Sequence, residues 1–122
     1  MKVSGIMVGS SQPKVLGEFY AKFLGKPGWQ QDDWYGFGNK SSSMMIGPHS
    51  EVKGSNKEPG RHIIFIACDN VKADFAKVKK AADPKVVAEP YLPDEKNMPD
   101  MWLATFEDPD GNYFQLSTPW EE

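Results

Sequence analysis

The feature that most constrains this fold is a dense turn signal between two runs of strand character, within residues 101–119. In the turn, Glu107 to Asn112, Pro109 presets one backbone φ angle, and Gly111 and Asn112 tolerate positive φ. Nearby Asp side chains can accept hydrogen bonds from the local backbone. About five loop residues between two strands suit a β-hairpin. The sequence therefore predicts a hairpin here.

The two runs alternate their side chains with the period of two that is typical of strands. In the second run Phe114 and Leu116 fall on one face, and Tyr113, Gln115 and Ser117 fall on the other. One face is apolar and the other is polar, so we expect the hairpin to face a core on its apolar side and a cavity on its polar side. The first run alternates likewise, with Trp102, Ala104 and Phe106 against Met101, Leu103 and Thr105.

Composition excludes several classes of protein. The chain has 122 residues, 39% of them hydrophobic and 25% charged, which is typical of one globular domain. A net charge of −3 with scattered basic residues argues against a nucleic-acid partner. No apolar run approaches the roughly 18 residues of a membrane span, and no signal-peptide core is evident. The single cysteine, Cys68, excludes an internal disulfide and favours a cytoplasmic location, where we expect it to be a small buried hydrophobe.

The first half of the chain is predicted to be one strand, one helix and three short strands. The helix is expected to start with Ser10 or Ser11 as N-cap and Pro13 in its first turn, and to end at Gly25. The strands are expected at 2–8, 29–32, 34–37 and 43–46. Trp29, Trp34, Tyr35 and Phe37 form an aromatic group that either packs in the core or makes a flat wall for a planar ligand.

After a turn-rich segment at 48–60 the same pattern begins again. A strand at 61–68 precedes a helix that Asp69 and Asn70 cap and that Asp83 and Pro84 end. A strand at 85–89 and a loop at 90–100 then lead to the hairpin. The order strand, helix, strands therefore occurs twice, which indicates an internal duplication.

The hairpin motif, ATFEDPDGNYFQL, resembles the last hairpin of the vicinal oxygen chelate superfamily, which includes glyoxalase I, bleomycin-resistance proteins and extradiol dioxygenases. The resemblance implies a single α+β domain, residues 1–122, of two βαβββ units in tandem whose curved mixed sheets surround a cleft. The first unit is expected at about 1–47, the linker at about 48–60 and the second unit at about 61–119. It also implies a homodimer, because single-domain members often associate in pairs.

Metal-using members of that superfamily hold a divalent ion with side chains from both units, and the resemblance places four positions for such ligands here. His62, in a stretch similar to the G-H-I motif, matches one position, and the neutral Gln115 stands at another where a carboxylate is usual. The first strand offers only Val3 or Gly5, and residues 43–46 offer no carboxylate. We therefore expect a degenerate metal site and no cofactor.

The sequence thus predicts a protein that binds a small molecule, with His62, Gln115, Tyr113, Trp102 and Trp34 lining its pocket. His62 is the best catalytic candidate, although a strand histidine can equally be satisfied by a neighbour. The alternative is a metal-dependent lyase, isomerase or dioxygenase of glyoxalase type, with Mn, Ni, Zn or Fe held by His62 and Gln115. A further possibility is a metal-free enzyme that uses His62 as a base.

Overall fold

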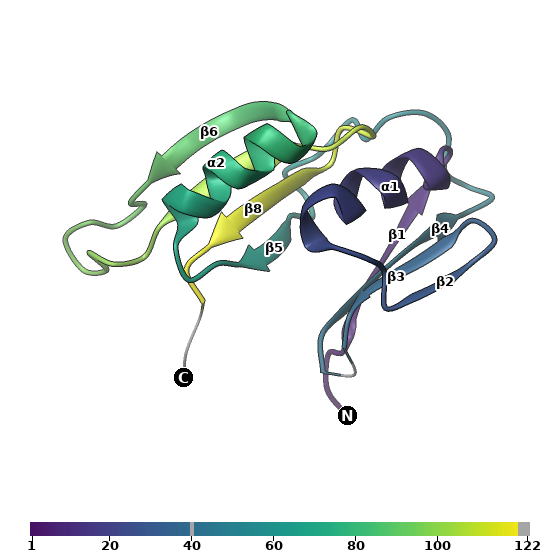
Figure 1. The fold of residues 1–122 in the computed structure, drawn as a ribbon, viewed down its shortest axis with the longest axis horizontal. Coiled ribbons are helices and arrows are strands. Elements are labelled where there is room, and N and C mark those ends of the chain that lie inside the picture. The colour runs from purple at the N-terminus through teal and green to yellow at the C-terminus, as the bar shows by residue number, and fades with distance from the viewer. Residues whose placement is uncertain (40, 120–122) are drawn as a thin grey trace. The chain divides into compact units, whose positions relative to one another are not determined.

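A computed structural model describes residues 1–39 and 41–119, and its chain forms two compact units, Met1–Ser55 and Asn56–Glu122 (Figure 1). The boundary between the units falls inside the turn-rich segment 48–60. Lys40, expected in a turn, and residues 120–122, expected at the end of the domain, lie outside the described residues. Each unit is described by itself below.

The first unit is a four-stranded mixed sheet with one helix. Its sheet has the order β1-β4-β3-β2, with β1 and β4 parallel and the other neighbours antiparallel. The elements along the chain are β1 (Gly5–Ser10), α1 (Pro13–Leu24), β2 (Trp29–Gln31), β3 (Trp34–Gly38) and β4 (Ser43–Pro48). All five predicted elements are present, although β1 begins three residues later than predicted and both β1 and β4 end two residues later.

The start of α1 differs from the prediction. Gln12, not Ser10 or Ser11, is the N-cap residue, and its side chain makes no capping hydrogen bond. Ser10 belongs to β1 instead, where its hydroxyl oxygen accepts a hydrogen bond from the Gln12 N–H at 3.0 Å. Pro13 stands in the first helical turn as predicted. A backbone N–H there has no acceptor within the helix, so proline loses no hydrogen bond at this position.

The core of the first unit lies between α1 and its sheet. Leu16, Tyr20 and Ile46 are fully buried. Gly17 brings the helix close to the sheet, because a Cβ at this position would overlap the ring of the buried Tyr35. The helix therefore rests on the face of the sheet that carries Tyr35.

The second unit repeats this topology. Its sheet has the order β5-β8-β7-β6, again with the first pair parallel and the others antiparallel, and α2 packs on it (Figure 1). The two units together confirm the predicted α+β fold of tandem βαβββ units. The elements are β5 (Ile64–Ala67), α2 (Val71–Ala82), β6 (Lys85–Tyr91), β7 (Leu103–Glu107) and β8 (Tyr113–Ser117).

The ends of α2 confirm the sequence prediction in detail. The Asn70 side chain accepts a hydrogen bond from the Ala73 N–H at 3.0 Å, which satisfies one of the free donors of the first turn. Asp83 ends the helix in a left-handed conformation with φ of 44°. Because β6 continues to Tyr91, the following loop begins later than the predicted Pro90.

Stacked aromatic rings fill the core of the second unit. Phe106 stacks on Phe75 of α2 at a centroid distance of 4.9 Å and on Phe114 at 5.4 Å. Phe106, Phe114 and Leu116 are almost wholly buried. Phe114 and Leu116 therefore face the core, as their alternation predicts.

The turn between β7 and β8 is organised by one carboxylate. Asp108 is buried, and its Oδ1 accepts hydrogen bonds from the Asp110 and Asn112 N–H groups, both at 2.9 Å. Its Oδ2 accepts from Asn112 Nδ2 at 3.0 Å. The turn closes the strands so that Glu107 lies opposite Tyr113.

Within residues 1–39 and 41–119, we find no helix with the length and apolar character that crossing a membrane requires.

Candidate functional site

Each sheet has one face that packs against its helix and one helix-free face. In the second unit the register sets the two faces, because residues directly opposite on neighbouring strands point to the same side. Phe106 and Phe114 face α2, so Thr105 and Gln115 face the other way. This helix-free face carries two of the predicted site residues, Tyr113 and Gln115.

A short hydrogen bond orients Gln115. Its Nε2 donates to Oγ1 of Thr105, directly opposite on β7, at 3.0 Å. On its other side Gln115 is paired with Phe65 of β5, which is 62% exposed. We call Phe65, Thr105, Tyr113 and Gln115 the Gln115 patch. It places an oriented amide beside an exposed aromatic ring on the helix-free face.

The charges beside this patch neutralise each other. Glu107 lies opposite Tyr113, and its Oε2 is 3.5 Å from Nζ of Lys85 on β6. The Lys85 side chain is 74% exposed and that of Glu107 27%, so solvent reaches the pair and limits what it contributes to stability. The patch is therefore not strongly biased toward a ligand of either charge.

Trp34 lies on the helix-free face of the first unit. It alternates with Tyr35, which faces α1, and a Cβ added at Gly47 would overlap its indole ring. The aromatic group of the sequence is thus divided between the two faces of the sheet. Tyr35 and Phe37 are buried in the core, whereas Trp29 and Trp34 line the helix-free face.

His62 is not in a strand, contrary to the prediction for residues 61–68. β5 begins at Ile64, and His62 is an exposed residue of the bend before it. The reason lies just upstream. Arg61 donates its N–H to the Glu58 carbonyl, and its Nη2 contacts both Glu58 carboxylate oxygens at 3.0 and 3.1 Å.

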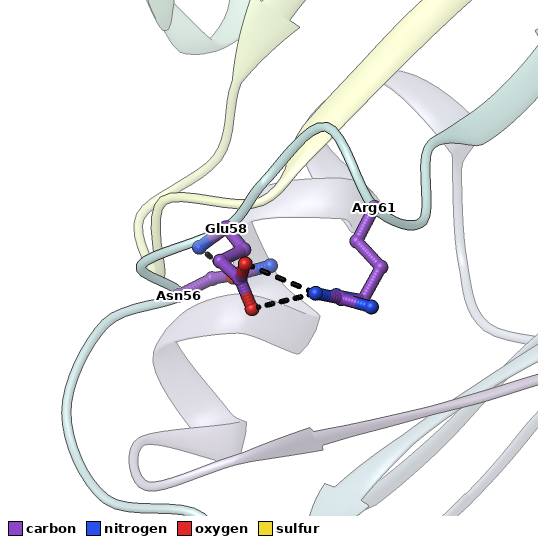
Figure 2. A network of polar contacts seen from close by, with 3 residues as sticks. All are labelled: Asn56, Glu58 and Arg61. Atoms are coloured by element: carbon purple, nitrogen blue, oxygen red, sulfur yellow. Dashed lines mark hydrogen bonds and ion pairs between the residues drawn. The ribbon is translucent and has the colours of Figure 1, made fainter.

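Figure 2 shows this turn, with Asn56 Oδ1 accepting from the Glu58 N–H at 2.9 Å. Asn56 in turn is fixed to the hairpin turn, through its N–H to the Asp110 carbonyl and its Nδ2 to Asn112 Oδ1. These contacts hold 56–61 as a turn, so the strand starts only after His62. The β5 residue paired with Gln115 is Phe65.

Trp102 lies away from the Gln115 patch. It precedes β7, and its backbone N–H donates a hydrogen bond to Thr118 Oγ1 at 2.9 Å. The ammonium nitrogen of Lys72 on α2 lies 4.1 Å from the centroid of the Trp102 ring. The ring is therefore on the helix side of the sheet. It lines a hollow of about 250 Å³ at the start of α2, whose other lining residues are Asp69, Asn70, Val71, Lys72, Asp100 and Thr118.

Comparison with solved structures agrees with this topology. A glyoxalase/bleomycin resistance protein from Albidiferax ferrireducens has 20% sequence identity and a TM-score of 0.73, over 97% of this chain and 98% of its own. The chain has the vicinal oxygen chelate fold. No family model and no curated protein matches the sequence.

Two further structures support the same fold. A glyoxalase-related enzyme from Fulvimarina pelagi has 13% identity and a TM-score of 0.73, over 97% of this chain and 88% of its own. A glyoxalase/bleomycin resistance protein/dioxygenase from Alicyclobacillus acidocaldarius has 13% identity and a TM-score of 0.69, over 98% and 92%. At these identities the likeness concerns the fold alone.

Many vicinal oxygen chelate proteins use a divalent ion, and the donor set of the described residues does not fit one. Gly5 and Ser43 are register partners on β1 and β4, and neither offers a carboxylate or an imidazole. Gln115 uses its Nε2 toward Thr105 and could offer a metal only its neutral Oε1, and His62 is outside the strand. Among the described residues, no group of three or more His, Cys, Asp or Glu side chains could hold a metal ion.

Cys68 follows β5 and is buried. Burial, followed by the interaction with the Asp74 side chain, raises its pKa from 9.0 to about 12. A thiol with so high a pKa is a poor nucleophile at neutral pH. Cys68 therefore acts as a small core residue, as expected.

Sequence reasoning missed two residues of the Gln115 patch, Phe65 and Thr105. The signal for Thr105 was present, because a five-residue hairpin loop fixes the register and places Thr105 opposite Gln115. Phe65 could not be assigned in this way, since its parallel pairing with β8 joins segments far apart in the sequence.

Proposed function

We propose that this chain is a small-molecule-binding protein of the glyoxalase/bleomycin-resistance type with a degenerate metal site. Its ligand is held on the helix-free face of the second unit's sheet. The single observation that carries the proposal is the Gln115 patch, where Thr105 fixes the Gln115 amide beside the exposed Phe65 ring.

A held amide is suited to recognition. The Thr105 hydroxyl occupies one Gln115 donor, which leaves the amide with a fixed direction before a ligand arrives. Pre-ordering of this kind reduces the entropy lost on binding. The exposed Phe65 ring supplies apolar contact area, and burying it against a ligand is favourable.

The wider assignment has three further parts. We propose that two chains form a homodimer, as the family resemblance of the sequence suggests, which light scattering would measure. We propose a cytoplasmic location, where a free thiol such as Cys68 persists. His62, although exposed before β5, is retained as the candidate proton-transfer residue should the chain prove catalytic.

A calorimetric titration series against a panel of metabolites and drugs tests the binding role. For a compound that binds, Gln115→Leu should weaken affinity about 5- to 30-fold, the cost of about one lost hydrogen bond in a desolvated site. Thr105→Val should give a smaller loss, because it removes only the orienting hydroxyl. Gln30→Leu, an exposed change on β2, is the matched control and should bind normally.

The metal-dependent alternative predicts a different result. Elemental analysis of protein purified without chelators would then find stoichiometric Mn, Ni, Zn or Fe, and His62→Ala would remove it. That result, or a panel in which no compound binds, would overturn the binding-protein proposal.

A further inference from the structure

The hollow of about 250 Å³ at the start of α2 lies on the helix side of the second unit, away from the Gln115 patch. One of its walls is the half-buried indole of Trp102, and the ammonium nitrogen of Lys72 lies 4.1 Å from the centroid of that ring. At this distance the negative face of the ring attracts the cation. The Trp102 ring is therefore placed so that it can hold a positive charge.

Hydrogen bonds of Thr118 hold this wall in place. Its Oγ1 accepts a hydrogen bond from the Trp102 N–H at 2.9 Å, and its own N–H donates to the Trp102 carbonyl at 3.1 Å. The Thr118 hydroxyl also donates to the Asp100 carbonyl at 3.3 Å. The backbone at Asp100 and Trp102 is thus fixed before a ligand arrives, which reduces the entropy lost on binding.

Two carboxylates, Asp69 and Asp100, line the same hollow as Lys72. In the part of the chain that the structure describes, none of these three side chains takes part in an ion pair. Lys72 is exposed and has a flexible four-carbon stem, so its ammonium group can leave the ring for solvent at little cost. Two unpaired negative charges and an aromatic face would then surround the vacated space.

We propose that this hollow is a binding site for a small alkylammonium cation, which replaces the Lys72 ammonium on Trp102 and pairs with Asp69 and Asp100. The inference goes beyond the proposed function, because Trp102 lies on the helix side of the sheet and Gln115 faces the other way. A protonated amine suits the site because its N–H groups can donate to both carboxylates. The volume lies below the roughly 300–1,000 Å³ that is typical of drug sites, so the ligand is small.

The competing ligand is a small anion at the first turn of α2, since helix N-termini attract anions and Lys72 adds a positive charge. Two observations argue against it. The Asn70 side chain already accepts from the Ala73 N–H, so that donor is occupied. The carboxylates of Asp69 and Asp100 would also repel an anion. With two negative side chains and one positive side chain in the lining, the cation is favoured.

The test uses three probes with the same four-carbon chain, namely butylamine, which is protonated at pH 7, neutral 1-butanol and anionic butanoate. Nuclear magnetic resonance titration, observed on the probe protons and on the Trp102 indole N–H, should show butylammonium binding at least fivefold tighter than the other two. Trp102→Leu should weaken butylammonium binding at least about fivefold. Trp29→Leu, which removes an exposed indole of the first unit, is the matched control and should not.

The charged residues give two further comparisons. Asp100→Asn should weaken butylammonium binding about two- to threefold, whereas Glu95→Gln, which removes an exposed charge from the same loop, should not. Lys72→Ala should tighten it about threefold or more, because the ring and the carboxylates then meet no competing cation. Lys77→Ala removes the same charge from an exposed position of α2 and should leave the affinity within twofold.

Each other outcome overturns the proposal. If butanoate binds better than butylammonium and Lys72→Ala abolishes that binding, the hollow is an anion site. If 1-butanol binds as well as butylammonium, charge has no part in recognition. If Lys72→Ala does not tighten butylammonium binding, Lys72 does not occupy the ligand's place. Melting temperatures show whether each variant is folded, and the exposed Lys72 decides the question should Trp102→Leu unfold the chain. The Gln115 patch is unchanged in all these variants, so failure here leaves the proposed function standing.

Discussion

Asp108 is the acceptor around which the β7–β8 turn is built, and replacing it tests the fold where the sequence specifies it most strongly. Three donors converge on its buried carboxylate, namely the Asp110 N–H, the Asn112 N–H and Asn112 Nδ2. A hydrogen bond to a charged group contributes about 1.5–3 kcal/mol net, and neighbouring bonds are not additive. We expect Asp108→Ala to lower the free energy of unfolding by about 3 kcal/mol.

Asp108→Asn refines the test. An amide keeps one acceptor oxygen for the two backbone donors, but its NH₂ group would face Asn112 Nδ2, which is also a donor. We expect a loss of about 1–2 kcal/mol, between wild type and the alanine variant. The measurement is urea unfolding followed by circular dichroism, with the m-value unchanged if only stability is affected.

Asp94→Ala is the matched control for Asp108→Ala. Asp94 also accepts a hydrogen bond from a backbone N–H, that of Asn97 at 3.2 Å, but in an exposed loop. Water replaces the lost acceptor there, so we expect a loss below about 1 kcal/mol. If Asp108→Ala is no more destabilising than Asp94→Ala, or if Asp108→Asn is as stable as wild type, the turn does not depend on this carboxylate.

Two further predictions concern the cores. Gly17→Ala should destabilise the chain by about 1–3 kcal/mol, because the new Cβ overlaps the buried Tyr35 ring, whereas Gly60→Ala should stay within about 0.5 kcal/mol in the same urea assay. Equal effects would show that α1 can move off the sheet at little cost. For Cys68, whose pKa is raised to about 12, a thiol reagent at pH 8 should react far faster in urea than with native protein. Because folding keeps this thiol protonated, its contribution to stability should be lost as pH rises from about 9 toward 12, and Cys68→Ala should lack that part of the pH dependence.

The sequence predicted the fold well because its signals were local. The hairpin turn, the Asn70 cap, the Asp83 stop and the duplicated order of elements each depend on a few neighbouring residues. Period-two alternation also placed Phe114 and Leu116 in the core correctly. Such signals depend on local backbone preferences and on the alternation of apolar and polar residues, and both can be read directly from the sequence.

The site was predicted less well because it depends on contacts between distant residues. The turn that removes His62 from β5 combines a local pair, Arg61 with Glu58 three residues earlier, with a distant one, Asn56 with the hairpin turn 56 residues further along the chain. Trp102 lies beside Lys72 because α2 packs on the sheet at that point. Neither contact leaves a periodic signal in the sequence.

The difference between the two helix-free faces is the strongest argument that they are functional. Both units have the same strand order and the same parallel and antiparallel pairings, so each sheet needs an apolar face toward its helix to form a core. In both units the helix-side face is apolar. On the opposite side the first unit presents Trp34, whose indole lies against Gly47, and the second presents the bonded pair Gln115 and Thr105. Stability alone does not require two faces with such different chemistry, so each face, taken by itself, is a candidate for ligand contact.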